Sequence, residues 1–379
     1  MSVLTASVVV TSDRVLRPGW VRISGDRIDA VGEGIAADPT ATDLGDVVLV
    51  AGFVDLHCHG GGGASFGDGA GEARRAADLH LAHGTTTLMA SLVTGSRARI
   101  SSQIDALAPL VVEGTLAGVH LEGPWLSSAQ CGAHDRTQLR APAPDEVDDL
   151  VGRDAVRMVT LAPELPGALD AVRRITGLGA IAAIGHTDAD HATTRAGIEA
   201  GARHATHLFN GMRPLRHRDP GPVVALLDDD RVTFELVRDG VHLDPSLCAW
   251  LDSSVGPGRV VAITDAMAAA GSVDGRYALG DAVVVVTDQV ARVEGTTTIA
   301  GSTATMDRIY RAAAGDRSDE AMVRATVQTA ANPARMLGLD DRGHLRAGSR
   351  ADLVVLSADS LEVRGVLCAG AWVASGSPS

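Results

Sequence analysis

Side chains that can bind metal ions stand at the ends of short apolar runs along most of this chain, and this pattern constrains the fold more than any other feature. His57 and His59 follow one such run and are separated by a single residue. Because residues i and i+2 of a strand point to the same face, a strand that ends there directs both imidazoles at one point. Similar side chains follow later apolar runs: Glu122, His186, His207 and Asp265. Polar groups delivered from successive strand ends are typical of a (β/α)8 barrel.

Other interpretations of single members of this set stay open. A lone His-x-His pair can be two hydrogen-bonded or surface histidines, and Asp265 can be the N-cap of a following helix. The shared position after apolar runs favours a metal site, because imidazole and carboxylate groups are ligands that divalent ions accept. For six further histidines we expect a solvent-facing or hydrogen-bonded role: His80, His83, His191, His204, His217 and His344.

The middle of the chain alternates between helical and strand patterns. Apolar periodicity predicts helices over 72–83, 97–110 and 193–200. Strands are predicted over 86–89, 118–121, 158–161, 180–184, 204–208 and 260–263. Both ends of the chain read as short β segments: 7–10, 20–24, 27–31, 46–50, 343–356 and 363–373. We therefore predict an α/β protein with a (β/α)8 barrel over 51–342 and a small β-sandwich domain formed by 1–50 and 343–379.

Composition agrees with an enzyme that acts on small molecules. A chain of 379 residues, 45% of them hydrophobic, can bury a sizeable core. The formal charge of −14 argues against nucleic-acid and anionic-membrane partners, which need basic surfaces. The first residues have no basic signal region, and no stretch is long and apolar enough to span a bilayer, so we expect a cytoplasmic protein.

The chain contains no lysine, since all 33 basic residues are arginine. This excludes Schiff-base catalysis, a P-loop lysine and a carboxylated-lysine metal bridge. The cysteines Cys58, Cys131, Cys248 and Cys368 form no Cys-x-x-Cys, so neither a zinc knuckle nor a disulfide framework is indicated. Cys131 lies in a loop that we expect to cover the site, as a passive small residue.

Several segments give the chain a family resemblance. The run Gly52-Phe-Val-Asp-Leu-His-Cys-His-Gly60 and the closing Gly-x-Leu-x-x-Gly-x-x-Ala-Asp-Leu-Val-Val resemble the amidohydrolase superfamily. Within it, the chain resembles the N-acetylglucosamine-6-phosphate deacetylase family over nearly its whole length. The segments that carry this resemblance are His120-Leu-Glu-Gly-Pro-Trp125, Gly132-Ala-His134, Gly185-His-Thr187, Thr206-His-Leu-Phe-Asn-Gly-Met212, Asp239-Gly-Val-His242, Thr264-Asp-Ala-Met267 and Ile299-Ala-Gly-Ser302.

The resemblance implies a set of metal ligands and a general acid and base. Glu122, His186 and His207 would hold a divalent metal ion, with Asp265 as the catalytic group. Family members that keep the first His-x-His pair bind a second metal, and this chain keeps both His57 and His59. We therefore expect two ions per subunit bridged by Glu122, with one ion as the alternative. Zinc is the expected metal, and iron, manganese and cobalt are alternatives that the same ligands accept.

The substrate implied by the resemblance is a phosphorylated amino sugar whose acetamide is hydrolysed. Asn210 and Gly211 would meet the phosphate, and Arg218 would complete that anion site from the neighbouring subunit of a homodimer. His134 and His242 would contact the sugar or the acetyl carbonyl. The full set of expected contacts is Ala133, His134, Asn210, Gly211, Arg218, His242, Ala300 and Gly301.

Other assignments remain open at this point. Arg218 can be an ordinary surface charge, and His242 can cap a turn. A deacetylase for the galactosamine epimer would share every metal ligand. A catalytically silent scaffold is the alternative from a different class.

Overall fold

The computed structural model describes residues 2–373 and divides into two compact units. Unit 1 holds the described parts of 1–55, 78–87 and 305–379. Unit 2 holds residues 56–77 and 88–304. No helix among the described residues is long and apolar enough to cross a membrane.

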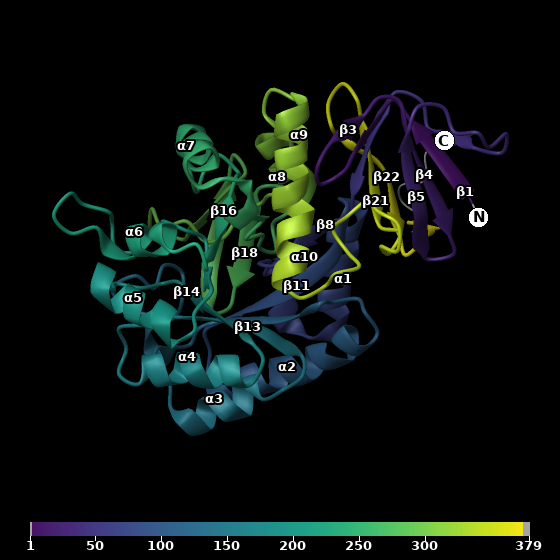
Figure 1. The fold of residues 1–379 in the computed structure, drawn as a ribbon. Coiled ribbons are helices and arrows are strands. Elements are labelled where there is room, and N and C mark those ends of the chain that lie inside the picture. Colours follow the sequence, from purple (N-terminus) through teal and green to yellow (C-terminus); the bar gives the residue numbers. More distant parts are fainter. Residues whose placement is uncertain (1, 374–379) are drawn as a thin grey trace. The chain divides into compact units, whose positions relative to one another are not determined.

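Unit 1 is built on two sheets, one made of N-terminal strands and one to which both ends of the chain contribute (Figure 1). The four-stranded sheet has the order β5 (Arg27–Glu33), β4 (Gly19–Ser24), β1 (Ser2–Ala6) and β6 (Thr42–Asp43). The six-stranded sheet has the order β23 (Ala371–Trp372), β22 (Val363–Cys368), β21 (Leu353–Ser357), β7 (Val47–Ala51), β2 (Val8–Val10) and β3 (Val15–Leu16). Strands β7 and β21 pair antiparallel, with Ala51 opposite Leu353. Leu4 and Val21 of one sheet share an apolar cluster with Leu49 and Leu353 of the other, as expected for a small sandwich.

The helices of unit 1 follow one another late in the chain. They are α8 (Met306–Ala314), α9 (Asp319–Thr326), a π-helical stretch (Val327–Ala331) and α10 (Asn332–Met336). At the start of α8, the buried Asp307 accepts hydrogen bonds from Thr305 Oγ1 at 2.5 Å and His83 Nδ1 at 3.2 Å. His83 is therefore a hydrogen-bonded histidine, as predicted.

An eight-stranded sheet forms the barrel, so the predicted (β/α)8 fold is confirmed. Its order is β17 (Val260–Ile263), β16 (Thr233–Val237), β15 (His204–Ala205), β14 (Ile181–Ile184), β13 (Val156–Leu161), β12 (Gly118–Glu122), β11 (Thr85–Val93) and β8 (Phe53–Asp55). Strands β11 to β17 pair in parallel. After β17 the chain meets the residues that follow β8, where Asp265 N donates to His57 O at 2.9 Å and His59 N donates to Ala266 O at 2.7 Å.

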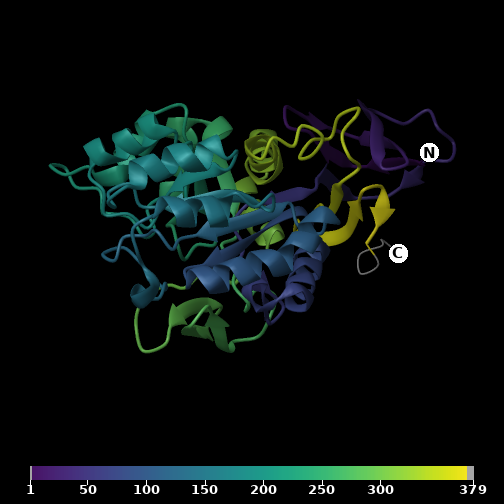
Figure 2. The same cartoon turned by 90° about the horizontal axis from the view of Figure 1, so that it is seen from below.

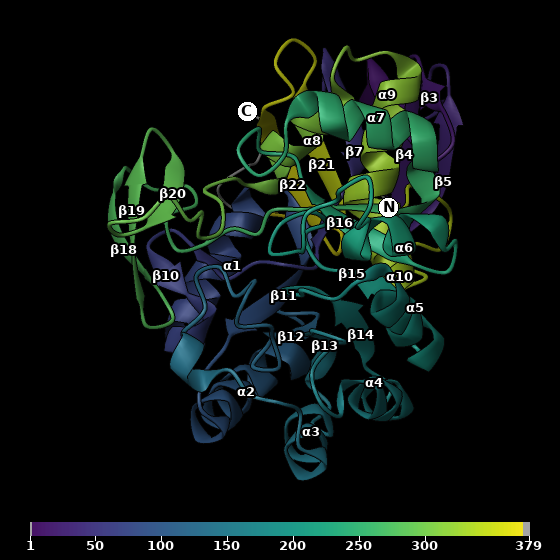
Figure 3. The ribbon, with the colours of Figure 1, turned by 90° about the vertical axis from the view of Figure 1, so that its left-hand side faces the viewer.

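Helices lie outside the strands of unit 2, as Figure 3 shows for the helices beside β12, β13 and β14. They are α2 (Arg97–Val112), α3 (Pro144–Val151), α4 (Ala168–Gly177), α5 (His191–Ala200), α6 (Gly221–Asp228) and α7 (Pro245–Val255), and α1 (Ala70–Ala82) precedes them in the chain. Leu107 of α2 and Val172 of α4 share an apolar cluster with Leu121 of β12. This packing buries the outer face of the barrel strands.

The structure differs from the predicted strands of this part of the chain at three main places. The predicted strand 204–208 ends at Ala205, because His207 turns the backbone to a positive φ of 27°. Strand β16 was not predicted at all. A three-stranded antiparallel sheet, β18 (Gly275–Leu279), β19 (Ala282–Thr287) and β20 (Val290–Val293), follows β17 and is seen at the bottom of Figure 2.

Candidate active site

Two pairs of histidines meet where the barrel strands end. His57 and His59 follow β8, and their Nε2 atoms lie 3.1 Å apart. His186 follows β14 and His207 follows β15, and their Nε2 atoms are also 3.1 Å apart. The exposed fraction is at most 6% for each of the four residues. The structure therefore brings all four predicted histidine ligands together, although they come from three different strand ends.

The outer nitrogen of each histidine donates a hydrogen bond to a fixed oxygen. For His57, His59, His186 and His207 in turn, the acceptors are Glu235 Oε2 at 3.0 Å, Ser91 O at 3.2 Å, Gln130 O at 2.8 Å and Asn210 O at 3.1 Å. An imidazole whose Nδ1 carries the proton presents its Nε2 lone pair on the other side. Each pair thus directs two lone pairs at the space between its rings, and only a cation, whether a proton or a metal ion, can stabilise that arrangement.

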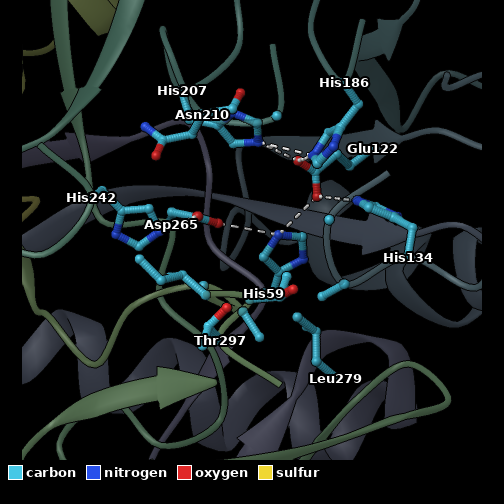
Figure 4. A pocket seen from close by; sticks show the side chains of 17 residues that line it. His59, Glu122, His134, His186, His207, Asn210, His242, Asp265, Leu279 and Thr297 are labelled. Carbon is cyan, nitrogen blue, oxygen red and sulfur yellow. Dashed lines mark hydrogen bonds and ion pairs between the residues drawn. The ribbon is translucent and has the colours of Figure 1, made fainter. Parts of the chain in front are cut away.

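Glu122, at the end of β12, lies between His59 and the pair His186 and His207 (Figure 4). Its Oε1 is 3.1 Å from His186 Nε2 and 2.9 Å from His207 Nε2. Its Oε2 is 3.2 Å from His59 Nε2. Oε1 also lies 3.5 Å from His57 Nε2. This one carboxylate therefore contacts both halves of the cluster, as a bridging ligand would.

His134 also reaches Glu122, but its protonation differs from that of the other histidines. The backbone N–H of Thr94 donates to His134 Nδ1 at 3.3 Å, so the proton of a neutral His134 sits on Nε2. Nε2 then faces Glu122 Oε2 at 3.3 Å as a donor. Burial lowers the pKa of His134 to about 4, so the ring stays neutral near pH 7. His134 is thus suited to donate to a substrate oxygen, whereas His207 is suited to bind a metal.

Asp265, two residues after the end of β17, closes the cluster on the side of His57 and His59. Its Oδ1 lies 3.5 Å from His57 Nε2 and 3.4 Å from His59 Nε2, and its Oδ2 lies 3.5 Å from His242 Nε2. His242 is held in turn by Asp239, whose Oδ2 is 2.8 Å from His242 Nδ1. No helix begins between β17 and β18, so the N-cap interpretation of Asp265 is excluded.

Buried negative charge surrounds the histidines. Burial acts to lower the pKa of His57, but the charges of Glu235, Glu122 and Asp265 outweigh it and raise that pKa well above its ordinary value. For His59, burial again opposes the shift, and hydrogen bonds with Asp265 and Glu122 raise the pKa to about 8. Carboxylates that attract protons to these nitrogens also attract a divalent cation that displaces them. The nitrogen and oxygen donors present are those that zinc and similar metals accept, so these residues fit a metal ion.

Three residues of the site hold strained backbone conformations. His186, His207 and Asp265 have φ values of 46°, 27° and 48°. Such left-handed conformations are uncommon for residues other than glycine and cost energy that the surrounding structure must supply. Each lies one or more residues beyond the end of a barrel strand, and the turn directs its side chain toward the cluster.

A cavity of about 300 Å³ opens over the cluster. All the predicted substrate-contact residues line it except Arg218; they are Ala133, His134, Asn210, Gly211, His242, Ala300 and Gly301. Five further lining residues were not predicted as contacts: Gly132, Leu279, Thr297, Thr298 and Ile299. Arg218 lies on an exposed loop and is not among the lining residues of this single chain. Its predicted origin in a neighbouring subunit stays a prediction.

Sequence reasoning also missed two carboxylates that support the site. Glu235 bonds His57, and Asp239 bonds His242. The signal for Glu235 is an ionisable residue in the middle of the apolar run Thr233–Val237, where burial of a charge needs a partner. His204, at the start of the predicted strand 204–208, lies in β15 and is the other buried partner of Glu235, at 3.1 Å.

Comparison with known proteins places this site in a family. The amidohydrolase family model matches residues 48–373. The chain therefore belongs to the amidohydrolase family of hydrolases.

Within that family, several similar proteins are named as deacetylases of N-acetylated amino-sugar phosphates. The N-acetylglucosamine-6-phosphate deacetylase of Bos taurus is 37% identical over 87% of this chain and 84% of its own length. The N-acetylgalactosamine-6-phosphate deacetylase of Escherichia coli O157:H7 is 35% identical over 93% of this chain and 94% of its own. A solved structure of a mutant of the Mycobacterium smegmatis N-acetyl-D-glucosamine-6-phosphate deacetylase, in complex with N-acetyl-D-glucosamine-6-phosphate, is 48% identical with a TM-score of 0.95, covering 98% of each chain.

Proposed function

We propose that this enzyme hydrolyses the acetamide of N-acetyl-D-glucosamine 6-phosphate to glucosamine 6-phosphate and acetate. The observation that carries the proposal is the cluster in which four Nε2 lone pairs and Glu122 converge beneath a cavity, with Asp265 beside them. The names of the relatives, and the ligand named for the Mycobacterium smegmatis structure, support this substrate. Such a reaction belongs to amino-sugar catabolism and recycling.

The metal ligands in this proposal are His57, His59, Glu122, His186 and His207. We infer two divalent ions per subunit, zinc first among them, with Glu122 as the bridge. Such ions lower the pKa of a bound water and polarise a carbonyl, which addresses the two obstacles to amide hydrolysis. The absence of lysine from the chain supports Glu122 as the bridge, since a carboxylated lysine cannot serve.

The remaining steps of the proposal use groups of the chain itself. Asp265 takes a proton from the attacking water and then delivers it to the departing amine nitrogen. His134, protonated on Nε2, donates to the acetyl carbonyl oxygen as negative charge develops there. His242, held by Asp239, contacts the sugar near Asp265. Asn210 and Gly211 meet the phosphate, and Ala133, Ala300 and Gly301 leave room for main-chain groups to bond the ligand.

We infer that the active form is a homodimer in which Arg218 crosses to the neighbouring site. The guanidinium is a planar fork that matches phosphate geometry, and its exposure on a loop outside its own chain's cavity supports a contact in trans. Mixing Arg218→Ala chains with Asp265→Asn chains tests this. Hybrid dimers would hold one site with both residues intact and regain part of the activity. No recovery under conditions of demonstrated subunit exchange would contradict the contact in trans.

The galactosamine epimer is the second candidate substrate, because one relative acts on it by name. Both substrates require the same metal ligands and differ only at the C4 hydroxyl. Kinetics on the two epimers, paired with elemental analysis of the purified protein, test the whole proposal. A higher kcat/KM for the galactosamine epimer would replace the substrate, and absence of both bound metal and activity would remove the proposed function. We also place the protein in the cytoplasm, which the four free cysteines support.

A further inference from the structure

Glu235 lies deep inside the barrel and contacts both halves of the histidine cluster. Glu235 is 0% exposed and occupies the middle of β16 (Thr233–Val237). Oε2 accepts hydrogen bonds from His57 Nδ1 at 3.0 Å and from the backbone N–H of His207 at 2.9 Å. Oε1 lies 3.1 Å from His204 Nε2. It is not a lining residue of the cavity, so it has no path to the substrate.

The main chain of Glu235 supports the same turn as its side chain. The carbonyl of Glu235 accepts from the backbone N–H of Leu208 at 3.0 Å. Consecutive amides, those of His207 and Leu208, are therefore both held by this one residue. His207 needs this support, because its φ of 27° lies in the strained left-handed region.

The bond to His57 has a separate consequence. It fixes the proton on Nδ1 and directs the Nε2 lone pair toward His59 and Glu122. A carboxylate that accepts from the outer nitrogen of a ligand histidine also makes that ligand more basic, and loss of such a partner typically weakens metal binding by about 10- to 100-fold.

We propose that Glu235 is a positioning residue that orients His57 by its side chain and His207 by both side chain and main chain, so that one carboxylate sets the geometry of both metal-binding halves. The inference rests on the proposed function, because it assigns these histidines to metal ions. It adds a role for a residue that touches neither metal nor substrate. It also predicts that the two metal sites weaken together when this single side chain is removed.

Three substitutions separate the contributions of Glu235. Glu235→Ala removes the bonds and the charge. Glu235→Gln removes the charge, but its amide oxygen can still accept from His57 and His207. Its NH2 group can donate to Nε2 of His204 when the proton of that histidine sits on Nδ1. Glu235→Asp keeps the charge on a side chain one methylene shorter, which cannot reach His57 and His207 at once. Glu146 is the matched control, since it is another buried carboxylate and its side chain bonds Arg140 and Trp125 rather than the histidines.

The measurements are metal affinity at each site, by competition with a chelator, and the visible absorption spectrum of the cobalt-loaded protein, which reports ligand geometry. We expect Glu235→Ala to lose about 10- to 100-fold in affinity at both sites. Glu235→Gln should stay within a few-fold of the unmodified protein, with an unchanged cobalt spectrum, and Glu235→Asp should fall toward Glu235→Ala. Glu146→Gln and Glu146→Ala should lower the melting temperature of the metal-free protein and leave metal affinity unchanged.

Several results would overturn the inference. A folded Glu235→Ala protein with unchanged affinity at both sites would do so, as would a loss confined to one site. If Glu235→Ala does not fold, Glu235→Asp decides, and unchanged affinity in that variant contradicts positioning. Equal losses of metal affinity in Glu235→Gln and Glu235→Ala would mean that the charge of Glu235, and not its positioning of the histidines, supports metal binding. Failure of the unmodified protein to bind any metal would remove the proposed function itself, which is a separate outcome.

Discussion

Replacing Asp265 by asparagine removes the proton acceptor of the proposed reaction and little else. The amide is nearly isosteric with the carboxylate, and asparagine tolerates the φ of 48° at this position better than most residues do. Burial acts to raise the pKa of Asp265, but His57, His59 and His242 outweigh it and hold the pKa at about 2. The group is therefore ionised near pH 7 and able to accept a proton, which an amide cannot do.

The expected loss follows from that chemistry. A positioned general acid and base contributes about 10²- to 10⁴-fold to a rate, and in the proposed reaction Asp265 would serve both proton transfers. We expect kcat to fall by about 10³-fold or more. This loss corresponds to an increase of about 4 kcal/mol in the activation free energy. Metal at Glu122, His186 and His207 should be retained, because none of those side chains is changed.

The assay is release of glucosamine 6-phosphate, measured together with metal content and melting temperature. Asp244→Asn is the matched control, because Asp244 is an exposed N-cap of α7 and asparagine caps a helix as well as aspartate does. That control should keep near-normal turnover. Turnover of Asp265→Asn within tenfold of the unmodified enzyme, with metal bound, would refute the role of Asp265.

Three further predictions concern the metal pair, the phosphate and acid stability. The double variant His57→Ala, His59→Ala should lose one of its two metal ions and keep the other. If elemental analysis still finds two metal ions per chain, the two histidines have a structural role and do not bind metal. Arg218→Ala should raise KM for the phosphorylated sugar by about 30- to 1000-fold, or about 2 to 4 kcal/mol. KM for unphosphorylated N-acetylglucosamine should be nearly unchanged. Equal effects on both substrates would exclude a phosphate contact. Burial acts to raise the pKa of Asp307, but bonds from His83 and Thr305 lower it below its ordinary value. A lowered folded-state pKa gives stability that is present above the unfolded value of about 3.9 and lost as pH falls through the folded value. Asp307→Asn should lower the free energy of unfolding at pH 7, measured with denaturant, by roughly 1 to 3 kcal/mol. It should also reduce the loss of stability that the unmodified protein shows as the pH falls. The same loss of stability at acid pH in both proteins would contradict this.

Much of the barrel was predictable because its strands are short apolar runs bounded by polar strand ends. The runs before His57 and Glu122 show this clearly, and both residues lie where the pattern put them. Strand β16 was not predicted because Glu235 interrupts its apolar pattern. The predicted strand at 204–208 was too long because no local sequence signal indicates the turn at His207. The sheet β18–β20 has the alternation of an ordinary hairpin, but it was not recognised in the sequence. The domain limits 51–342 and 1–50 with 343–379 stay a prediction.

By itself, the sequence determined which metal-binding side chains this protein has, their positions after apolar runs, and the absence of lysine, which excludes a carboxylated-lysine bridge. Residue type and spacing along one strand are local properties, so they can be read without a fold. Only the tertiary structure decided which nitrogen of each histidine faces inward, since that depends on acceptors such as Gln130 O and Ser91 O that are distant in the chain. It also decided that Nε2 of His134 faces Glu122 as a donor and that Glu235 bonds one histidine of each pair, His57 and His207. Hydrogen bonds of this kind join residues across many strands, and no local pattern in the chain records them.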